Sequence, residues 1–152
     1  MANKFFPVSI DLNNKNILVI GAGKIALRKV ETLMSYNCNI LVITKDILEE
    51  KFLELEKSNK IKVLKNQEFE EKFLENIFLV IAATNNEVLN KNISQLCISK
   101  NILVNNITSK DDMNVRFASI YEKDDIQIAI SANGNPKKAI EIKNKIKNIF
   151  EK

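Results

Sequence analysis

Apolar runs alternate with helix-spaced apolar positions along the first two thirds of this sequence. Short apolar runs at residues 17–20, 39–43, 61–64, 77–82 and 102–104 predict five β-strands. Between these runs, apolar residues recur every three or four positions, which predicts amphipathic helices. Their stripes are Ala26, Val30, Leu33 and Met34; Leu48, Phe52 and Leu55; and Leu89, Ile93, Leu96 and Cys97. Alternating strands and helices are typical of an α/β fold with a parallel sheet covered on both faces.

The pattern changes after Ile107. Two short apolar runs, 117–121 and 126–131, flank the polar residues 122–125, which predicts a β-hairpin. A final helix follows, with Pro136 in its first turn and an apolar stripe at Ile142, Ile146, Ile149 and Phe150. We therefore predict two domains, 1–112 and 113–152. A hairpin and one helix make a small core, so we expect the second domain to pack on the first or on another copy of itself.

The first predicted strand runs into two glycines, in the segment NILVIGAGKIA at residues 16–26. Gly21 permits a tight turn, Gly23 lets the backbone approach a pyrophosphate, and the small Ala26 lets the next helix pack closely on the strand. That helix begins near Lys24 and Ile25, and its N-terminus directs free N–H groups and the positive end of its dipole at the phosphates. The context of strand, turn and helix favours a Rossmann-like dinucleotide site over a purely structural turn.

The end of the second predicted strand bears on the choice of cofactor. NAD sites usually carry an acid there to hold the ribose hydroxyls, whereas this chain has Thr44 and Lys45, followed by Asp46. Lys45 suits the extra phosphate of NADP, and Asp46 either reaches the ribose or only caps the next helix. The residues leave NAD and NADP open.

Ala83, Thr84 and Asn85 follow the fourth predicted strand, at the sheet edge where ligands of open α/β sheets bind. We predict that their hydroxyl and amide groups contact the cofactor ribose or nicotinamide, and we add Asn105, near the end of the fifth strand, to these contacts.

Composition narrows the chemistry. The chain has 152 residues, 45% hydrophobic and 28% charged, as expected for an ordinary soluble domain. The absence of histidine excludes Ser-His-Asp and Cys-His catalysis and histidine-ligated metals. Cys38 and Cys97 have no metal-ligand spacing, so we interpret them as buried thiols and predict no metal site. No signal peptide or membrane-spanning stretch is recognisable, which predicts a cytoplasmic protein without a membrane partner.

The net charge of +4 would suit nucleic acid, an anionic membrane surface or an acidic small molecule. The lysines are scattered, and the densest group, along the final helix, is interpreted as a solvated face. Because no aromatic residues are interleaved with these lysines, we expect no nucleic-acid partner.

Several segments resemble one family of enzymes over nearly the whole chain and in order. They are Phe6-Pro7 with Asp11-Leu12, residues 17–29 (ILVIGAGKIALRK), 80–86 (VIAATNN), Val104-Asn105 and 128–134 (IAISANG). Together they resemble the bacterial siroheme-synthase dehydrogenase family, the precorrin-2 dehydrogenases. The segments A-L-R-K, A-A-T-N and I-S-x-N-G distinguish this resemblance from a generic Rossmann domain.

The resemblance implies NAD-dependent oxidation of precorrin-2 to sirohydrochlorin, with ferrochelatase activity in some members. Hydride passes to the nicotinamide and protons to solvent or a base, so positioning does much of the catalytic work. The resemblance also implies a homodimer formed through the region after the nucleotide domain. Lys110, Arg116 and Lys137 are candidates for meeting the eight carboxylates of the tetrapyrrole, or else are simply surface charges.

Two departures from the family pattern concern catalysis. Family members often carry an aspartate where this chain has Thr108, so we name Thr108, Asp111 and Asp112 as candidate catalytic residues. We predict that Asp111 or Asp112 substitutes as acid/base, the alternative being solvated turn carboxylates. The family also usually continues into a helical segment that walls the tetrapyrrole cleft, so we expect a different wall or a partner protein here. The rival interpretations are a nucleotide-sensing module, like the regulatory domains of potassium transporters, and a catalytically inactive tetrapyrrole carrier.

Overall fold

A computed structural model describes residues 4–151, and the chain divides into two compact units, Met1–Val115 and Arg116–Lys152. Each unit is described by itself. The division falls three residues after the predicted boundary at 112. The assignment of nucleotide binding to one part and of dimerisation or substrate binding to the other stays a prediction.

The first unit is built on a five-stranded parallel sheet. Its strands are β1 (Asn16–Ile20), β2 (Asn39–Thr44), β3 (Lys62–Lys65), β4 (Leu79–Ala82) and β5 (Leu103–Asn106). The strand order is β3-β2-β1-β4-β5, so the chain returns across the sheet between β3 and β4. This confirms the predicted α/β, Rossmann-like fold. All five strands were predicted within one or two residues of their observed bounds.

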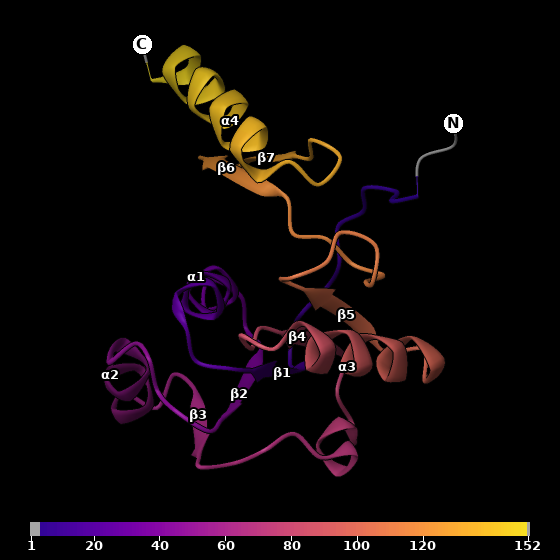
Figure 1. Cartoon of the computed structure of the whole chain (residues 1–152). Helices are drawn as coiled ribbons and strands as arrows, with labels where there is room; N and C mark the ends of the chain where they lie inside the picture. The colour runs from indigo at the N-terminus through magenta and orange to yellow at the C-terminus, as the bar shows by residue number, and fades with distance from the viewer. Residues whose placement is uncertain (1–3, 152) are drawn as a thin grey trace. The chain divides into compact units, whose positions relative to one another are not determined.

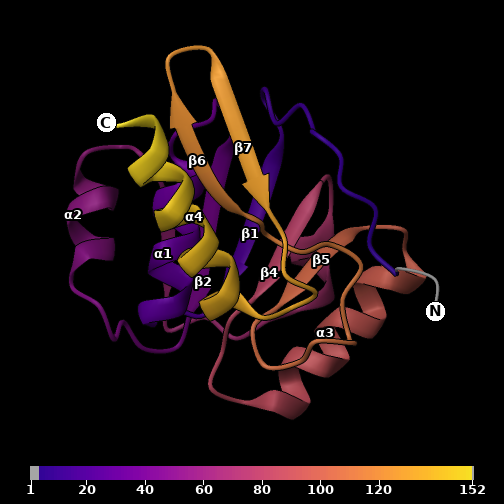
Figure 2. The same cartoon turned by 90° about the horizontal axis from the view of Figure 1, so that it is seen from above.

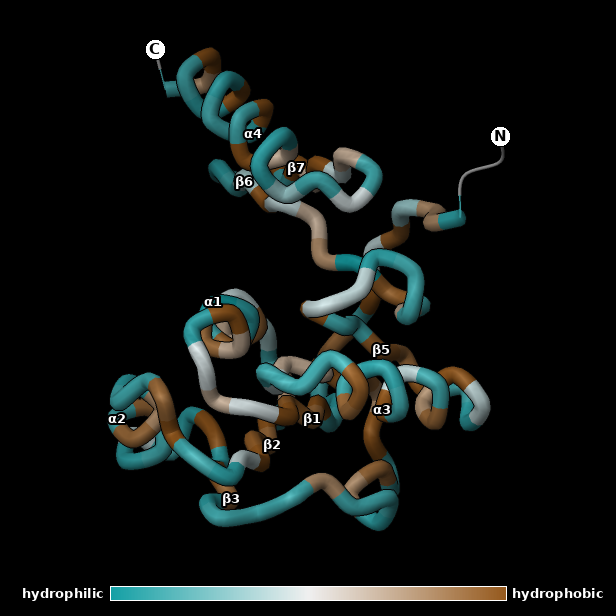
Figure 3. Tube along the Cα trace, viewed as in Figure 1, coloured by the Kyte–Doolittle hydropathy of each residue, from teal (hydrophilic) through white to brown (hydrophobic). Residues whose placement is uncertain are grey.

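Helices cover both faces of this sheet (Figure 1). They are α1 (Lys24–Leu33), α2 (Lys51–Lys57) and α3 (Glu87–Ser99), and a 3₁₀ turn, η1 (Glu71–Leu74), precedes β4. On one face, Leu18 of β1 and Val80 of β4 share a buried cluster with Ile93 and Cys97 of α3 and Leu74 of η1. α1 and α2 lie on the other side of the sheet (Figures 1 and 2). Because both faces are buried, the central strands β1 and β4 are nearly continuous apolar runs, as the brown trace at β1 shows in Figure 3.

The structure corrects one detail of the second predicted helix and excludes one of the two alternatives for Asp46. Leu48 was placed on its buried stripe, but α2 begins only at Lys51 and Leu48 is 60% exposed. The backbone N–H of Leu48 instead donates to the carbonyl of Ala22 at 3.2 Å, which holds this segment outside the helix. The N-cap residue of α2 is Glu50, so Asp46 does not cap the helix.

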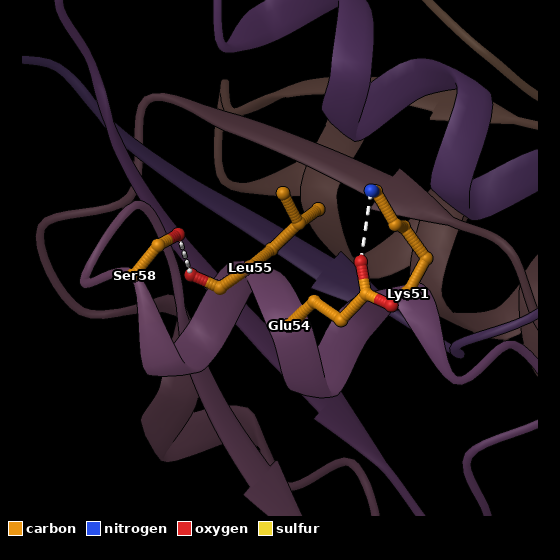
Figure 4. A network of polar contacts seen from close by, with 4 residues as sticks. All are labelled: Lys51, Glu54, Leu55 and Ser58. Carbon is orange, nitrogen blue, oxygen red and sulfur yellow. Dashed lines mark hydrogen bonds and ion pairs between the residues drawn. The ribbon is translucent and has the colours of Figure 1, made fainter.

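Local polar contacts lie at the two ends of α2 (Figure 4). At the start, Lys51 Nζ pairs with Glu54 Oε2 at 2.9 Å, on the exposed surface of the helix. At the end, the hydroxyl of Ser58 donates to the carbonyl of Leu55 at 2.9 Å, which satisfies one of the free carbonyls of the last turn.

The second unit is a hairpin and one helix, as predicted. Strands β6 (Ser119–Lys123) and β7 (Ile126–Ile130) are antiparallel, and Lys123 pairs with Ile126 across a two-residue turn. Asp124 in that turn has a positive φ of 54°. Helix α4 (Pro136–Phe150) is capped at its N-terminus by Asn135, whose side chain accepts from the N–H of Lys138. Figure 2 shows the hairpin seen from above.

No helix in residues 4–151 is long and apolar enough to span a membrane. Cys97 is fully buried and Cys38 partly buried, and both are free thiols. Burial raises the pKa of Cys97 to about 12, so this thiol is not a nucleophile near neutral pH.

Candidate functional site

A pocket of about 470 Å³ opens at the carboxyl ends of β1, β2 and β4. It is lined by the turn after β1, the segment after β2, the loop after β3 and the loop after β4: Ile20, Gly21, Ala22, Gly23, Ile43, Thr44, Lys45, Asp46, Leu48, Gln67, Glu68, Phe69, Ala83, Thr84, Asn85, Asn86 and Leu89. Ligands of open α/β sheets bind at the carboxyl ends of the strands, at the point where the strand order reverses.

A second hollow of about 590 Å³ lies at the opposite, amino ends of β1 and β2. Amide groups line it, but they bond to the protein itself: Asn39 Nδ2 donates to Asn16 Oδ1 at 3.0 Å, and Asn16 Nδ2 to the carbonyl of Asn76 at 3.1 Å. The hollow at the carboxyl edge is therefore the better candidate site.

Gly21 is required by the fold. Its φ is +106°, and an added Cβ would lie 2.3 Å from the carbonyl oxygen of Ala83. Its N–H continues the sheet by donating to the carbonyl of Ile43 at 2.9 Å. The turn after β1 thus packs directly on the start of the loop after β4, and no side chain fits between them.

Gly23 has no such reason to be glycine. Its φ of −96° and ψ of −178° are extended values that any residue adopts. Apart from its chain neighbours, the nearest atom to an added Cβ is Leu48 Cδ1 at 3.9 Å, an ordinary contact. Six asparagines and one aspartate of the described chain have positive φ, as do Gly21 and Gly134, but Gly23 does not. Gly23 lines the pocket, and the space that a side chain would occupy there is not filled by other protein atoms.

The N-terminus of α1 lies at the same place. Gly23 is its N-cap residue, with no side-chain cap and no acidic residue in the first turn. The N–H of Leu27 makes the first helical bond, to the carbonyl of Gly23 at 2.9 Å. The N–H groups of residues 24–26 have no helical acceptor because they begin the helix. Lys24 and Ile25 are exposed and lie outside the pocket lining.

At the end of β2, Thr44 is buried and its hydroxyl donates to the carbonyl of Asp46 at 2.6 Å. Lys45 Nζ lies 2.5 Å from Glu68 Oε1, and the two side chains are 67% and 70% exposed. The hydrogen bond and charge of Glu68 raise the pKa of Lys45. Glu68 was not among the predicted site residues. Its one sequence signal was its place in an acidic stretch directly after the third strand.

The loop after β4 is held by a fully buried amide, Asn90 of α3. Its Oδ1 accepts from the N–H and the hydroxyl of Thr84, at 3.1 and 2.6 Å. Its Nδ2 donates to the carbonyl of Thr84 at 2.9 Å and to the hydroxyl of Thr108 at 3.2 Å. This network fixes the Ala83-Thr84-Asn85 segment, all of which lines the pocket. Asn90 was predicted neither as a site residue nor as a core residue.

The loop after β5 is bonded mainly to itself. Thr108 donates its hydroxyl to Asn106 Oδ1 at 2.8 Å. Ser109 donates to Asp112 Oδ2 at 2.9 Å and accepts from the N–H groups of Asp111 and Asp112. None of the three predicted catalytic residues, Thr108, Asp111 and Asp112, is in the pocket lining.

Asn105 is also outside the pocket lining. It is buried, and its Nδ2 donates to the carbonyl of Val115 at 3.0 Å. Of the predicted cofactor contacts, the structure brings Gly21, Gly23, Thr44, Lys45, Ala83, Thr84 and Asn85 together around one pocket and leaves Lys24, Ile25 and Asn105 beside it. Their roles stay predictions.

Residues 8–119 match the model of a family described as putative NAD(P)-binding. The chain belongs to this family. The match includes every pocket residue and ends at the first residue of β6. The turn after β1 and the N-terminus of α1 beside it lie within the matched residues.

Curated relatives are siroheme synthases. Those of Mannheimia succiniciproducens and Buchnera aphidicola are 36% and 37% identical over 130 residues, which is 86% of this chain. The chain spans 27% of the length of each of these two relatives.

Among solved structures, "SirC, precorrin-2 dehydrogenase" superposes with a TM-score of 0.82 at 26% identity, over 95% of this chain and 70% of that one. A structure of GenD2 from gentamicin A biosynthesis in complex with NAD has a TM-score of 0.50 at 17% identity, over 71% of this chain and 32% of that one, and shows a shared fold only.

Proposed function

We propose that this chain binds NAD in the pocket at the carboxyl edge of its sheet and oxidises precorrin-2 to sirohydrochlorin. The observation that carries the proposal is Gly23, a glycine that neither backbone conformation nor protein packing requires, beside the uncapped N-terminus of α1. Close approach of a ligand backbone explains its lack of a side chain. The choice of substrate is supported by the likeness to a precorrin-2 dehydrogenase over nearly the whole chain.

The residues present fit a dinucleotide. The free N–H groups at the start of α1 would hold the pyrophosphate, because the positive end of the helix dipole faces it. Thr84 and Asn85 would contact the ribose or nicotinamide from a loop that Asn90 holds rigid. Bound NAD would supply the hydride acceptor for the oxidation.

Catalysis on this proposal depends on placing the tetrapyrrole beside the cofactor. Thr108 holds the loops after β4 and β5 together through its contact with Asn90. Asp112 stays the predicted base, with Asp111 beside it. Replacing Asp112 with asparagine tests this: a fall in kcat of about 100-fold with unchanged NAD binding identifies a base, and an unchanged kcat shows that this loop supplies none.

We also propose that the chain forms a homodimer through its second unit and acts in the cytoplasm. Within that unit, Ile140, Ile149 and Phe150 of α4 and Ile126 of β7 are exposed apolar side chains. A set of exposed apolar side chains on so small a unit is typical of an interface. Light scattering of the purified chain measures its mass in solution, and we expect the mass of a dimer. An Ile149→Asp variant should have the mass of a monomer.

The decisive assay for function adds precorrin-2 and NAD, or NADP, to the purified chain. Nicotinamide absorbance and the porphyrinoid spectrum are followed together, and we expect both to change in proportion. If NAD binds and neither spectrum changes, the chain is a nucleotide sensor or a tetrapyrrole carrier instead. A parallel incubation of sirohydrochlorin with ferrous iron tests for ferrochelatase activity.

A further inference from the structure

One ion pair lies in the wall of the pocket at the end of β2. Lys45 follows β2 directly and Glu68 belongs to the loop after β3, and their charged atoms are 2.5 Å apart. Both side chains are largely exposed, and exposed ion pairs contribute little to stability because water and salt screen them. This pair therefore matters for what the pocket binds, through its position in the wall, and not for the stability of the fold.

The end of β2 is where dinucleotide-binding folds distinguish the two nicotinamide cofactors. An acid there accepts from the ribose 2′-hydroxyl of NAD, whereas a basic residue accommodates the 2′-phosphate of NADP. By sequence alone, this chain has a basic residue at that position, which would suit NADP. In the structure, the ammonium group of Lys45 is already paired with Glu68.

The charges in the wall also disfavour a phosphate. Lys45, Asp46 and Glu68 are the titratable residues of the pocket lining, and they carry one positive and two negative charges. A phosphate group of about two negative charges would meet a net negative wall. A ribose hydroxyl would find carboxylate oxygens that accept a hydrogen bond.

The backbone fixes Glu68 in this place independently of its side chain. The N–H of Gln67 donates to the carbonyl of Thr44 at 3.0 Å, which anchors the loop after β3 to the end of β2. β3 pairs with β2 in parallel up to Lys65, opposite Thr44. Replacing the Glu68 carboxylate therefore leaves the loop and the pocket in position.

We propose that Glu68 makes this pocket select NAD over NADP, by holding Lys45 away from a 2′-phosphate and by presenting its own carboxylate to the ribose. Glu68 thus takes the place of the missing acid at the end of β2, and does so from the loop after the neighbouring strand β3. The inference rests on the proposed binding of NAD and adds to it the residue that sets cofactor choice.

The test compares NADH and NADPH binding to the full chain by nucleotide fluorescence titration, for the wild type and for Glu68→Gln. The wild type is expected to bind NADH about tenfold more tightly than NADPH. Glu68→Gln is expected to tighten NADPH binding about three- to tenfold, because Lys45 is released and one negative charge is removed. NADH binding should stay the same or weaken slightly, and the gain for NADPH should shrink at high salt.

Two further variants make the result specific. Glu54→Gln removes a carboxylate from the comparable exposed pair with Lys51, outside the pocket (Figure 4), and should leave the NADPH-to-NADH ratio unchanged. Lys45→Met added to Glu68→Gln should abolish the gain in NADPH binding, since Lys45 is the group that is released.

Each result decides between the two proposals. If the wild type binds neither nucleotide, the proposed function fails and this inference fails with it. If the wild type binds NADH but Glu68→Gln leaves the ratio within twofold, only the role of Glu68 is overturned. A wild type that prefers NADPH also overturns it, because Lys45 would then leave Glu68 for the phosphate.

Discussion

The turn after β1 and the loop after β5 both follow parallel strands, but they use their polar groups in opposite ways. The turn at Gly21 and Gly23 leaves helix N–H groups without a helical acceptor beside an open pocket. In the loop after β5, the side chains of Thr108, Ser109 and Asp112 form hydrogen bonds with other residues of the protein. The first is arranged to meet a ligand, while the second is arranged to hold its own shape.

This difference separates two parts of the proposed function. Cofactor binding depends on groups that the protein leaves open, and the turn after β1 has them. Acid/base catalysis would need a carboxylate that can exchange a proton with substrate, and Asp112 is bonded to Ser109 in this structure. The structure therefore supports binding and positioning more directly than it supports a base.

Replacing Gly21 with alanine has the largest expected effect. The added Cβ would lie 2.3 Å from the Ala83 carbonyl, at a φ that L-residues rarely adopt. We expect the free energy of unfolding to fall by about 3 kcal/mol or more, measured by urea denaturation. A loss below about 1 kcal/mol would show that the turn after β1 adapts, contrary to the rigid contact described above.

Replacing Asn90 with alanine comes next. It removes the partner of the N–H, hydroxyl and carbonyl of Thr84 and of the Thr108 hydroxyl. The N–H and carbonyl of half-buried Thr84 lose their side-chain partner, whereas the hydroxyls of Thr84 and of exposed Thr108 keep acceptors on Asn86 and Asn106. We expect the free energy of unfolding to fall by about 2–3 kcal/mol. Thr108→Val is the matched control, because it removes only the Thr108 hydroxyl from the same network, and about 1 kcal/mol is expected. Equal losses would mean that Thr108, rather than Asn90, organises the two loops.

The strands and the glycine turn were predictable from sequence because their signals are local. A run such as residues 17–20 is apolar at every position, since both faces of the sheet are covered. Leu48 was misplaced because its spacing fits a helix, whereas its N–H is held by Ala22 of the turn after β1. The hydrogen bond from Leu48 to Ala22 keeps this residue out of the helix that its spacing predicts.

The parts of the site that sequence did not reveal depend on strand pairing. Glu68 meets Lys45 only because β3 lies beside β2, which brings residues from two separate loops to one edge. Asn90 likewise looked like one more polar residue of a helix, and its role depends on the loop that α3 covers. Glu68 and Asn90 are visible in the sequence, but the contacts that each makes with other parts of the chain are not.

Gly23→Ala is expected to differ from Gly21→Ala, because it should weaken NADH binding without lowering stability. Gly23→Ala should leave the free energy of unfolding within about 0.5 kcal/mol of the wild type, because the backbone is extended and the Cβ position is open. NADH binding should weaken about tenfold, which corresponds to about 1.4 kcal/mol, because the new methyl group occupies space that the pyrophosphate approaches. Fluorescence titration measures this. Unchanged affinity would remove the main support for a phosphate site at this turn.

The smallest expected effect concerns the loop after β5. Ser109→Ala removes the hydroxyl that accepts from the N–H groups of Asp111 and Asp112 and donates to the Asp112 carboxylate. These are local bonds in a partly exposed turn, so we expect a loss of about 0.5–1 kcal/mol in the free energy of unfolding. NADH affinity should not change, because Ser109 lies outside the pocket lining. If kcat for precorrin-2 oxidation rises in this variant while stability falls, then Ser109 restrains Asp112, and the loop after β5 holds a base that its own hydrogen bonds keep from the substrate.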